Sequence, residues 1–91
     1  MSPLVSIPAP LRADDDPARV VTVSAETVGE ALATLARQRP RVESYLFDRE
    51  GNLRAFVNVF VNSDDVRALD GLATRVSDRD EIVIVPTIAG G

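Results

Sequence analysis

The stretch Glu81-Ile82-Val83-Ile84-Val85-Pro86 decides the fold. Four consecutive branched aliphatic residues predict a strand at the centre of a sheet, and Pro86 is expected to end it. Another strand is predicted at residues 56–61, FVNVFV, where three valines alternate with Phe, Asn and Phe. Since alternate residues of a strand point to opposite faces, the valines are expected to lie on one face and Phe60 on the other.

A helix is predicted from Thr27 to about Arg39. Thr27 and Glu30 have the spacing of a capping box, and Pro40 is expected to stop the helix. Gly29 weakens a helix by up to about 1 kcal/mol relative to Ala, so packing has to compensate. Apolar residues recur at helical spacing and form one stripe, which consists of Val28, Ala31, Leu32, Leu35 and Ala36.

Shorter elements complete the pattern. Residues 4–7 and 19–24 predict two strands joined by about eleven residues, residues 41–48 a short second helix, and residues 66–67 a short edge strand. Because the chain starts with a hairpin, it lacks the regular alternation of a doubly wound α/β fold. One helix must then cover one face of the sheet, and the right-handed crossover rule fits parallel first and last strands at its centre.

This element order predicts an α+β fold of the β-grasp (ubiquitin-like) type, with one main helix on a mixed four- to five-stranded sheet. A single domain is expected at residues 1–86, followed by a flexible tail at residues 87–91. The predicted core consists of Ile7, Val21, Leu32, Leu35, Val57, Val59, Val61, Ile82 and Ile84.

Composition excludes several classes of function. The 91 residues contain no Cys and no His, which removes thiolate and histidine chemistry and the commonest metal ligands. A net charge of −4 argues against nucleic acid as a partner. No apolar run is long enough to cross a membrane, and the N-terminus does not resemble a signal peptide. We therefore expect a soluble, cytoplasmic protein that is not an enzyme.

The last two residues, Gly90-Gly91, are the strongest candidate for a functional group. The alternatives without a function are a frayed chain terminus and an engineered remnant. The dipeptide follows directly after a predicted central strand and Pro86, which favours a tail that presents its terminal carboxylate. Glycine suits such a tail because it has no Cβ and adopts any φ, so that it fits a narrow cleft.

Several segments resemble the bacterial ubiquitin-like sulfur carriers, namely residues 56–62, 65–67, 71–74, 78–86 and 89–91. This family includes the small subunit of molybdopterin synthase and the carrier of thiazole synthesis. The resemblance is closest to the actinobacterial carriers that deliver sulfide for cysteine synthesis, where it extends to residues 5–8 and 11–12. Arg79 is a departure, since the family often has Gly in this turn, but the turn is remote from the tail.

The resemblance implies a mechanism for the carboxylate of Gly91. An activating partner similar to the ubiquitin-activating enzymes would use ATP to adenylate it, and a sulfur nucleophile would then displace AMP to leave a thiocarboxylate. In the cysteine-making relatives, that sulfur attacks an aminoacrylate on a pyridoxal-phosphate synthase, and a metal-dependent peptidase releases cysteine. The carrier itself is expected to bind neither cofactor nor metal. Gly90 would give the tail access to its partners.

An apolar patch on the outer sheet face is the second candidate site. Phe60, Val83 and Val85 are expected to lie there together, and such a patch on a small protein is typical of a docking surface. A dimer contact or a covering loop is the alternative. In the tail, partner contacts are also expected from Pro86, Ile88 and Ala89.

Polar residues elsewhere have two interpretations. The Asp clusters at residues 14–16, 64–65 and 78–80 form turns or bind a cation. Asn58 and Asn62 are solvated strand residues or contact a ligand.

Other functions remain open from the sequence. A carrier for molybdopterin, thiazole or tRNA thiolation would end in the same two glycines. A ubiquitin-like modifier that forms isopeptide bonds through Gly91 belongs to another class, as does an interaction module with an inert tail.

Overall fold

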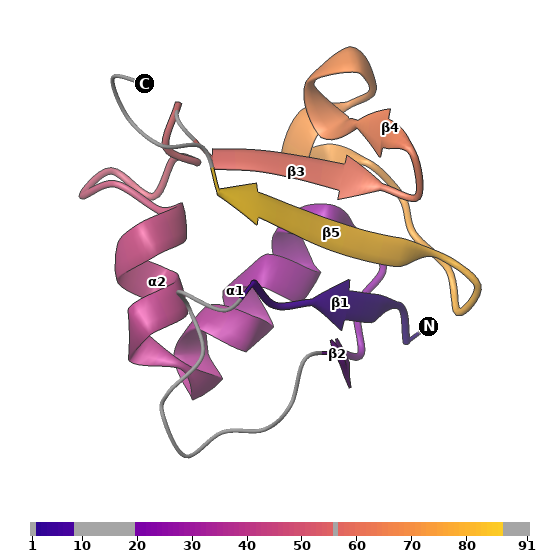
Figure 1. Cartoon of the computed structure of the whole chain (residues 1–91), viewed down its shortest axis with the longest axis horizontal. Helices are drawn as coiled ribbons and strands as arrows, with labels where there is room; N and C mark the ends of the chain where they lie inside the picture. The colour runs from indigo at the N-terminus through magenta and orange to yellow at the C-terminus, as the bar shows by residue number, and fades with distance from the viewer. Residues whose placement is uncertain (1, 9–19, 56, 87–91) are drawn as a thin grey trace.

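The structure, a computed structural model, describes residues 2–8, 20–55 and 57–86. Its strands are β1 (Leu4–Ser6), β2 (Val20–Thr22), β3 (Val57–Val61), β4 (Asp64–Asp65) and β5 (Glu81–Pro86). They form one sheet with the order β2-β1-β5-β3-β4 (Figure 1). β1 and β5 are parallel, and the other pairs are antiparallel. The predicted parallel pair at the centre is therefore confirmed.

The two faces of the sheet differ in the predicted way. On β3, Val57, Val59 and Val61 are buried, whereas Asn58 and Phe60 are half-buried on the opposite face. On β5, Ile82 and Ile84 are buried, Val83 is half-buried and Val85 is 38% exposed. The valine face of β3 and the isoleucine face of β5 together form the floor of the core.

Helix α1 (Val28–Gln38) covers that inner face, and Figure 1 shows it passing behind the strands. The predicted apolar stripe is buried throughout, with Val28, Ala31, Leu32, Leu35 and Ala36 at 5% exposure or less. Burial of this stripe in the core stabilises the domain through the hydrophobic effect.

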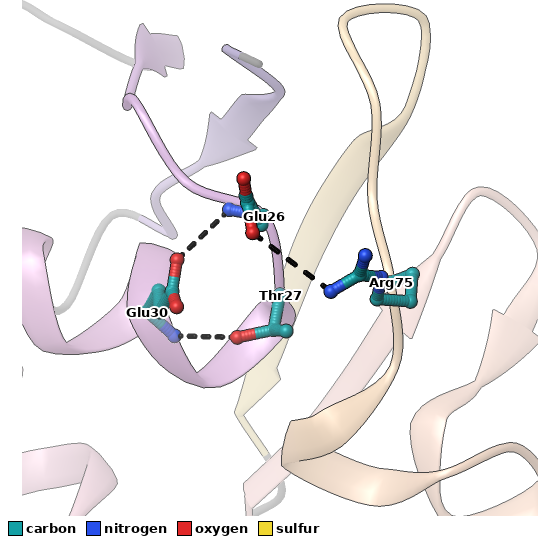
Figure 2. Close-up of polar contacts among 4 residues, drawn as sticks. All are labelled: Glu26, Thr27, Glu30 and Arg75. Carbon is teal, nitrogen blue, oxygen red and sulfur yellow. Dashed lines mark hydrogen bonds and ion pairs between the residues drawn. The ribbon is translucent and has the colours of Figure 1, made fainter.

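Two hydrogen bonds between Glu30 and the residues before it cap the start of α1, as Figure 2 shows. Thr27 Oγ1 accepts a hydrogen bond from the Glu30 N–H at 3.2 Å. The Glu30 carboxylate reaches back to the N–H of Glu26 at 3.0 Å, one residue before the N-cap. The Glu26 carboxylate also lies 3.8 Å from the Arg75 guanidinium, which is exposed. The predicted capping pair is thus present, with its second bond shifted by one residue.

Gly29 allows α1 to approach the 3₁₀ turn η3 (Gly71–Ala73) closely. A Cβ built on Gly29 would lie 3.0 Å from the carbonyl oxygen of Leu72 and 3.2 Å from its Cβ. The helix propensity lost at Gly29 is therefore compensated by packing that a larger residue would disturb.

A second helix, α2 (Pro40–Leu46), packs beside α1. Pro40 ends α1 as predicted and occupies the first turn of α2, where its missing N–H costs nothing. Val42 and Leu46 are buried and Tyr45 is half-buried, so the inward residues of this helix are those expected.

One expectation about the edges of the sheet is wrong, and a second is met only in part. Residues 66–67 do not form the edge strand; β4 does, and Val66–Ala68 is the 3₁₀ turn η2. The Asp65 carboxylate accepts from the Arg67 N–H at 2.8 Å, and this cap favours the turn over the strand. Val21 is only half-buried because β2 is the other edge, whereas its cross-strand neighbour Val5 is fully buried.

The predicted link over residues 8–18 and the tail at residues 87–91 lie largely or wholly outside the described residues, as does Phe56. Among the helices that the structure describes, none has the length and apolar character needed to cross a bilayer.

Candidate functional site

The tail leaves the domain from the end of β5. In the antiparallel pair with β3, Val85 lies opposite Asn58 and Pro86 lies opposite Val57. β5 ends at Pro86, as the sequence predicted. The predicted tail residues Ile88, Ala89, Gly90 and Gly91 lie beyond the described residues. The body therefore fixes the point from which the tail starts, which we call the tail root (residues 85–86).

The outer sheet face brings the three predicted patch residues together. Phe60 and Val83 are direct cross-strand neighbours, and Val85 follows two residues later on the same face. Aromatic and β-branched neighbours of this kind contact each other across a sheet. The predicted grouping is present, with Val83 and Val85 on the strand that precedes the tail and Phe60 on the neighbouring β3.

Two further apolar residues extend this face. Leu4 is 42% exposed and Val20 is 46% exposed. Ser6 lies opposite both Val20 and Val83, so Val20, Ser6, Val83 and Phe60 form one row across four strands. The sequence did not reveal Leu4 and Val20, because three-residue strands are too short to show an alternation. We call the five apolar residues Leu4, Val20, Phe60, Val83 and Val85 the outer patch.

At the start of β5, the end away from the tail root, polar side chains hold the preceding turn by hydrogen bonds. Asn62 has a positive φ of 57°, and its side-chain Oδ1 accepts from the Glu81 N–H at 3.1 Å. Its Nδ2 donates to the Asp80 carboxylate at 3.0 Å, and the Ser77 N–H donates to the same carboxylate at 2.8 Å. Asn62 and Asp80 thus hold the turn before β5, so Asp80 is a turn residue as one interpretation predicted, whereas Asn62 lies in a turn and not in a strand.

These bonds stabilise the charged form of Asp80. The Asn62 amide is the main cause, followed by the Ser77 N–H, and together they hold the pKa of Asp80 below its usual value. The stability gained from this charge is present above the unfolded pKa and is lost as the pH falls through the lowered folded value.

Arg67 occupies the edge of the sheet at the tail end. Its guanidinium Nη2 donates to the carbonyl oxygen of Val57 at 2.7 Å, and Nη1 donates to Asn58 Oδ1 at 2.9 Å. Longer contacts of 3.4 Å join Nη2 to the carbonyl oxygens of Arg54 and Ala55. Asn58 is therefore hydrogen-bonded within the protein. Sequence reasoning missed Arg67, because most of its partners are backbone carbonyls, which leave no pattern in the sequence.

A shallow groove of about 670 Å³ lies between α1, α2 and the loop that follows α2. Its lining includes Gly29, Ala33, Phe47, Arg54 and Leu72. The side chains of the outer patch do not line it. Neither the groove nor the other described residues bring together three metal-ligating side chains. The acidic cluster at residues 14–16 lies outside the described part of the chain.

Comparison with known proteins gives a consistent result. The ThiS family model matches residues 5–91. Sulfur carrier protein CysO of Mycobacterium tuberculosis is 38% identical over 93 residues, which cover 100% of both chains. Small archaeal modifier protein 3 of Haloferax volcanii is 34% identical over 80 residues, which cover 88% of this chain and 76% of the relative.

Solved structures agree with the sequence matches. One chain in the crystal structure of the BexX/CysO complex of Amycolatopsis orientalis superposes with a TM-score of 0.83 at 35% identity. The match covers 97% of this chain and 98% of that one. At this similarity the correspondence extends to the whole domain, including the strand that carries the tail.

Proposed function

Because this chain belongs to the ThiS family of sulfur carriers, which have the β-grasp fold and are not enzymes, we propose that its working group is the carboxylate of Gly91. The proposal rests on the similarity to CysO over the full length of both proteins. The carboxylate oxygen attacks the α-phosphorus of ATP and releases pyrophosphate, which gives an acyl-adenylate. A sulfur nucleophile at the oxidation level of hydrosulfide then displaces AMP and leaves a thiocarboxylate.

The chain's composition suits this division of labour. It has neither Cys nor His, so it offers no thiolate and no imidazole base for either step. An adenylating partner supplies the ATP site and the sulfur transfer, and the carrier supplies the acyl group. We place this chemistry in the cytoplasm, with no cofactor and no metal bound to this chain.

Cysteine synthesis is the proposed destination of the sulfur, on the strength of the likeness to CysO. The acceptor is then a pyridoxal-phosphate synthase, whose bound aminoacrylate the sulfur attacks, and a metallopeptidase frees the product. A protein modifier is the second candidate, favoured by the 34% identity to small archaeal modifier protein 3. A modifier would form an amide bond between Gly91 and a lysine of another protein.

Intact mass measurement tests the proposal. The protein is incubated with ATP, a sulfide source and the adenylating enzyme of its own organism. We expect its mass to rise by the difference between one sulfur and one oxygen atom, and fragmentation should place the change at Gly91. A product joined to lysines of other proteins, without the mass change, would favour the modifier instead. No change of either kind would contradict the proposal.

We further propose that the outer patch docks on the adenylating enzyme. Docking would remove water from Phe60, Val83 and Val85, which lie on the strands next to the tail root. The face also carries Leu4 and Val20, so the apolar surface extends across the sheet. Pro86, Ile88 and Ala89 would make further contacts as the tail enters the enzyme.

Arginine substitutions in the patch should weaken docking while the fold persists. For Phe60→Arg, Val83→Arg and Val85→Arg, we expect the KM for the carrier to rise by about tenfold or more, because docking would bury an unpaired guanidinium. The free energy of unfolding should change by roughly 1 kcal/mol or less. Adenylation rate against carrier concentration measures the first quantity, and chemical denaturation the second.

Leu69→Arg is the matched control, because Leu69 is 44% exposed and lies outside the patch, after η2. It should leave KM unchanged. If the three patch variants fold and are adenylated as well as the parent, the outer patch is not the docking surface.

A further inference from the structure

Among the strands that the structure describes, only β5 pairs with the tail end of β3. β4 pairs with Phe60 and Val61 and does not reach Val57 or Asn58. On the other side, Val57 and Asn58 face Pro86 and Val85 of β5. The first residues of β3 therefore form an edge of the described sheet, and they are also the cross-strand neighbours of the tail root.

Arg67 takes the place of a further strand at this edge. The Val57 N–H turns away from β5 and donates to the Arg54 carbonyl at 3.1 Å. The Val57 carbonyl receives the Arg67 guanidinium at 2.7 Å. The second arm of the guanidinium holds the Asn58 side chain at 2.9 Å. One planar fork thus fixes both residues of β3 that face the tail root.

The backbone of Arg67 is itself held in place by its neighbours in the chain. It lies in η2, whose turn is capped by the Asp65 carboxylate through the Arg67 N–H. Val66, the preceding residue, is 1% exposed and belongs to the core. The guanidinium is therefore held from a rigid point on the body of the protein. Its contacts at the edge are with carbonyl and amide oxygens, and the planar fork reaches several of them at once in a way that an ammonium group does not.

We propose that Arg67 is a positioning residue for the chemistry at Gly91, an inference that rests on the proposed function. By holding Val57 and Asn58, it keeps their partners Pro86 and Val85 paired at the end of β5. Without it, this end of the two strands frays, and the chain that leads to Gly91 loses its fixed starting point. The segment before Gly91 then samples more conformations, and the carboxylate is less often aligned for attack on ATP.

This role predicts a specific kinetic signature. Phe60 and Val83 of the outer patch keep their places in the sheet, so docking weakens only through Val85, whereas alignment of the tail affects the step after docking. Arg67→Ala should therefore lower kcat for adenylation by about tenfold, and the KM for the carrier should rise by a smaller factor. Arg67→Lys keeps the charge but loses the fork, so kcat should still fall by about threefold or more.

Amide hydrogen exchange of the free carrier gives an independent readout. In both Arg67 variants the N–H groups of Val85 and Asn58 should exchange faster, whereas that of Ile82, near the centre of the sheet, should not. Arg75→Ala is the matched control. Arg75 also makes a polar contact, but its partner Glu26 lies near the start of α1, where Arg75 forms a β-bridge with Thr27. This substitution should change neither kcat nor exchange at Val85.

Several outcomes would overturn the inference. If Arg67→Lys restores the parent kcat, or if KM rises while kcat is unchanged, Arg67 acts through its charge on a partner. If Arg67→Ala does not fold, the lysine variant decides by the same criteria. If the parent protein is not adenylated at all, the proposed function fails, while exchange at Val85 still tests whether Arg67 holds the tail root.

Discussion

Deletion of Gly91 should abolish sulfur loading and leave the stability of the protein almost unchanged. Among the residues that the structure describes, the buried core lies between Val5 and Ile84, and we expect the tail to add no residue to it. Without Gly91 the chain ends one residue short, so its new terminal carboxylate should not reach the position at which ATP is attacked. We expect no detectable adenylation and a melting temperature equal to that of the parent.

The measurement combines intact mass after incubation with the adenylating enzyme and thermal unfolding of the free carrier. Thr87→Ala is the control, because it changes the tail but keeps Gly90 and Gly91, and it should load sulfur normally. A deletion variant that still gains sulfur would show that the loaded group is not the carboxylate of Gly91. A variant that unfolds would show that the tail is part of the fold.

Leu32→Ala should cause a much larger loss of stability than any substitution in the outer patch. Leu32 belongs to α1, and its side chain is completely buried in the core between this helix and the sheet. Truncation of a buried leucine leaves a cavity and typically costs about 2–5 kcal/mol. That is a large part of the roughly 5–15 kcal/mol by which a domain is stable, so the variant should be partly unfolded at moderate temperature.

Chemical denaturation of the parent and the variant measures this effect. Leu69→Ala removes the same atoms from a residue that is 44% exposed, and it should cost about 0.5 kcal/mol or less. If the two substitutions cost the same, the stripe on α1 does not stabilise the domain in the way that its burial indicates.

Regular elements of this fold were predictable because their periods were visible. The stripe on α1 repeats over three turns, and β3 alternates over five residues, so both buried faces followed from the sequence. β1 and β2 have only three residues each, too few to show which residue points inward. That is why Val5 was missed, whereas Val21 faces the core as expected and is only half-buried because β2 is an edge strand.

Local side-chain bonds account for the other difference. β propensity favoured a strand at Val66, but the Asp65 carboxylate caps a turn there instead. The outer patch followed from alternation alone, whereas Arg67 did not, because its partners at the edge of β3 are set by tertiary structure. The role of the tail stays a prediction, and it rests on Gly90-Gly91, whose chemical signature depends on no contact in the body.

The central parallel pair has a consequence for how the protein folds. Residue 4 of β1 lies opposite residue 81 of β5, so the middle of the sheet joins segments that are far apart in sequence. Such contacts raise the contact order, and folding is slower than in a helical protein of this size. During synthesis, the sheet cannot form completely until β5 has been made, because β5 lies between β1 and β3. The strand that bears the tail is thus the strand that completes the sheet, and an incomplete chain would present open strand edges instead of a usable tail.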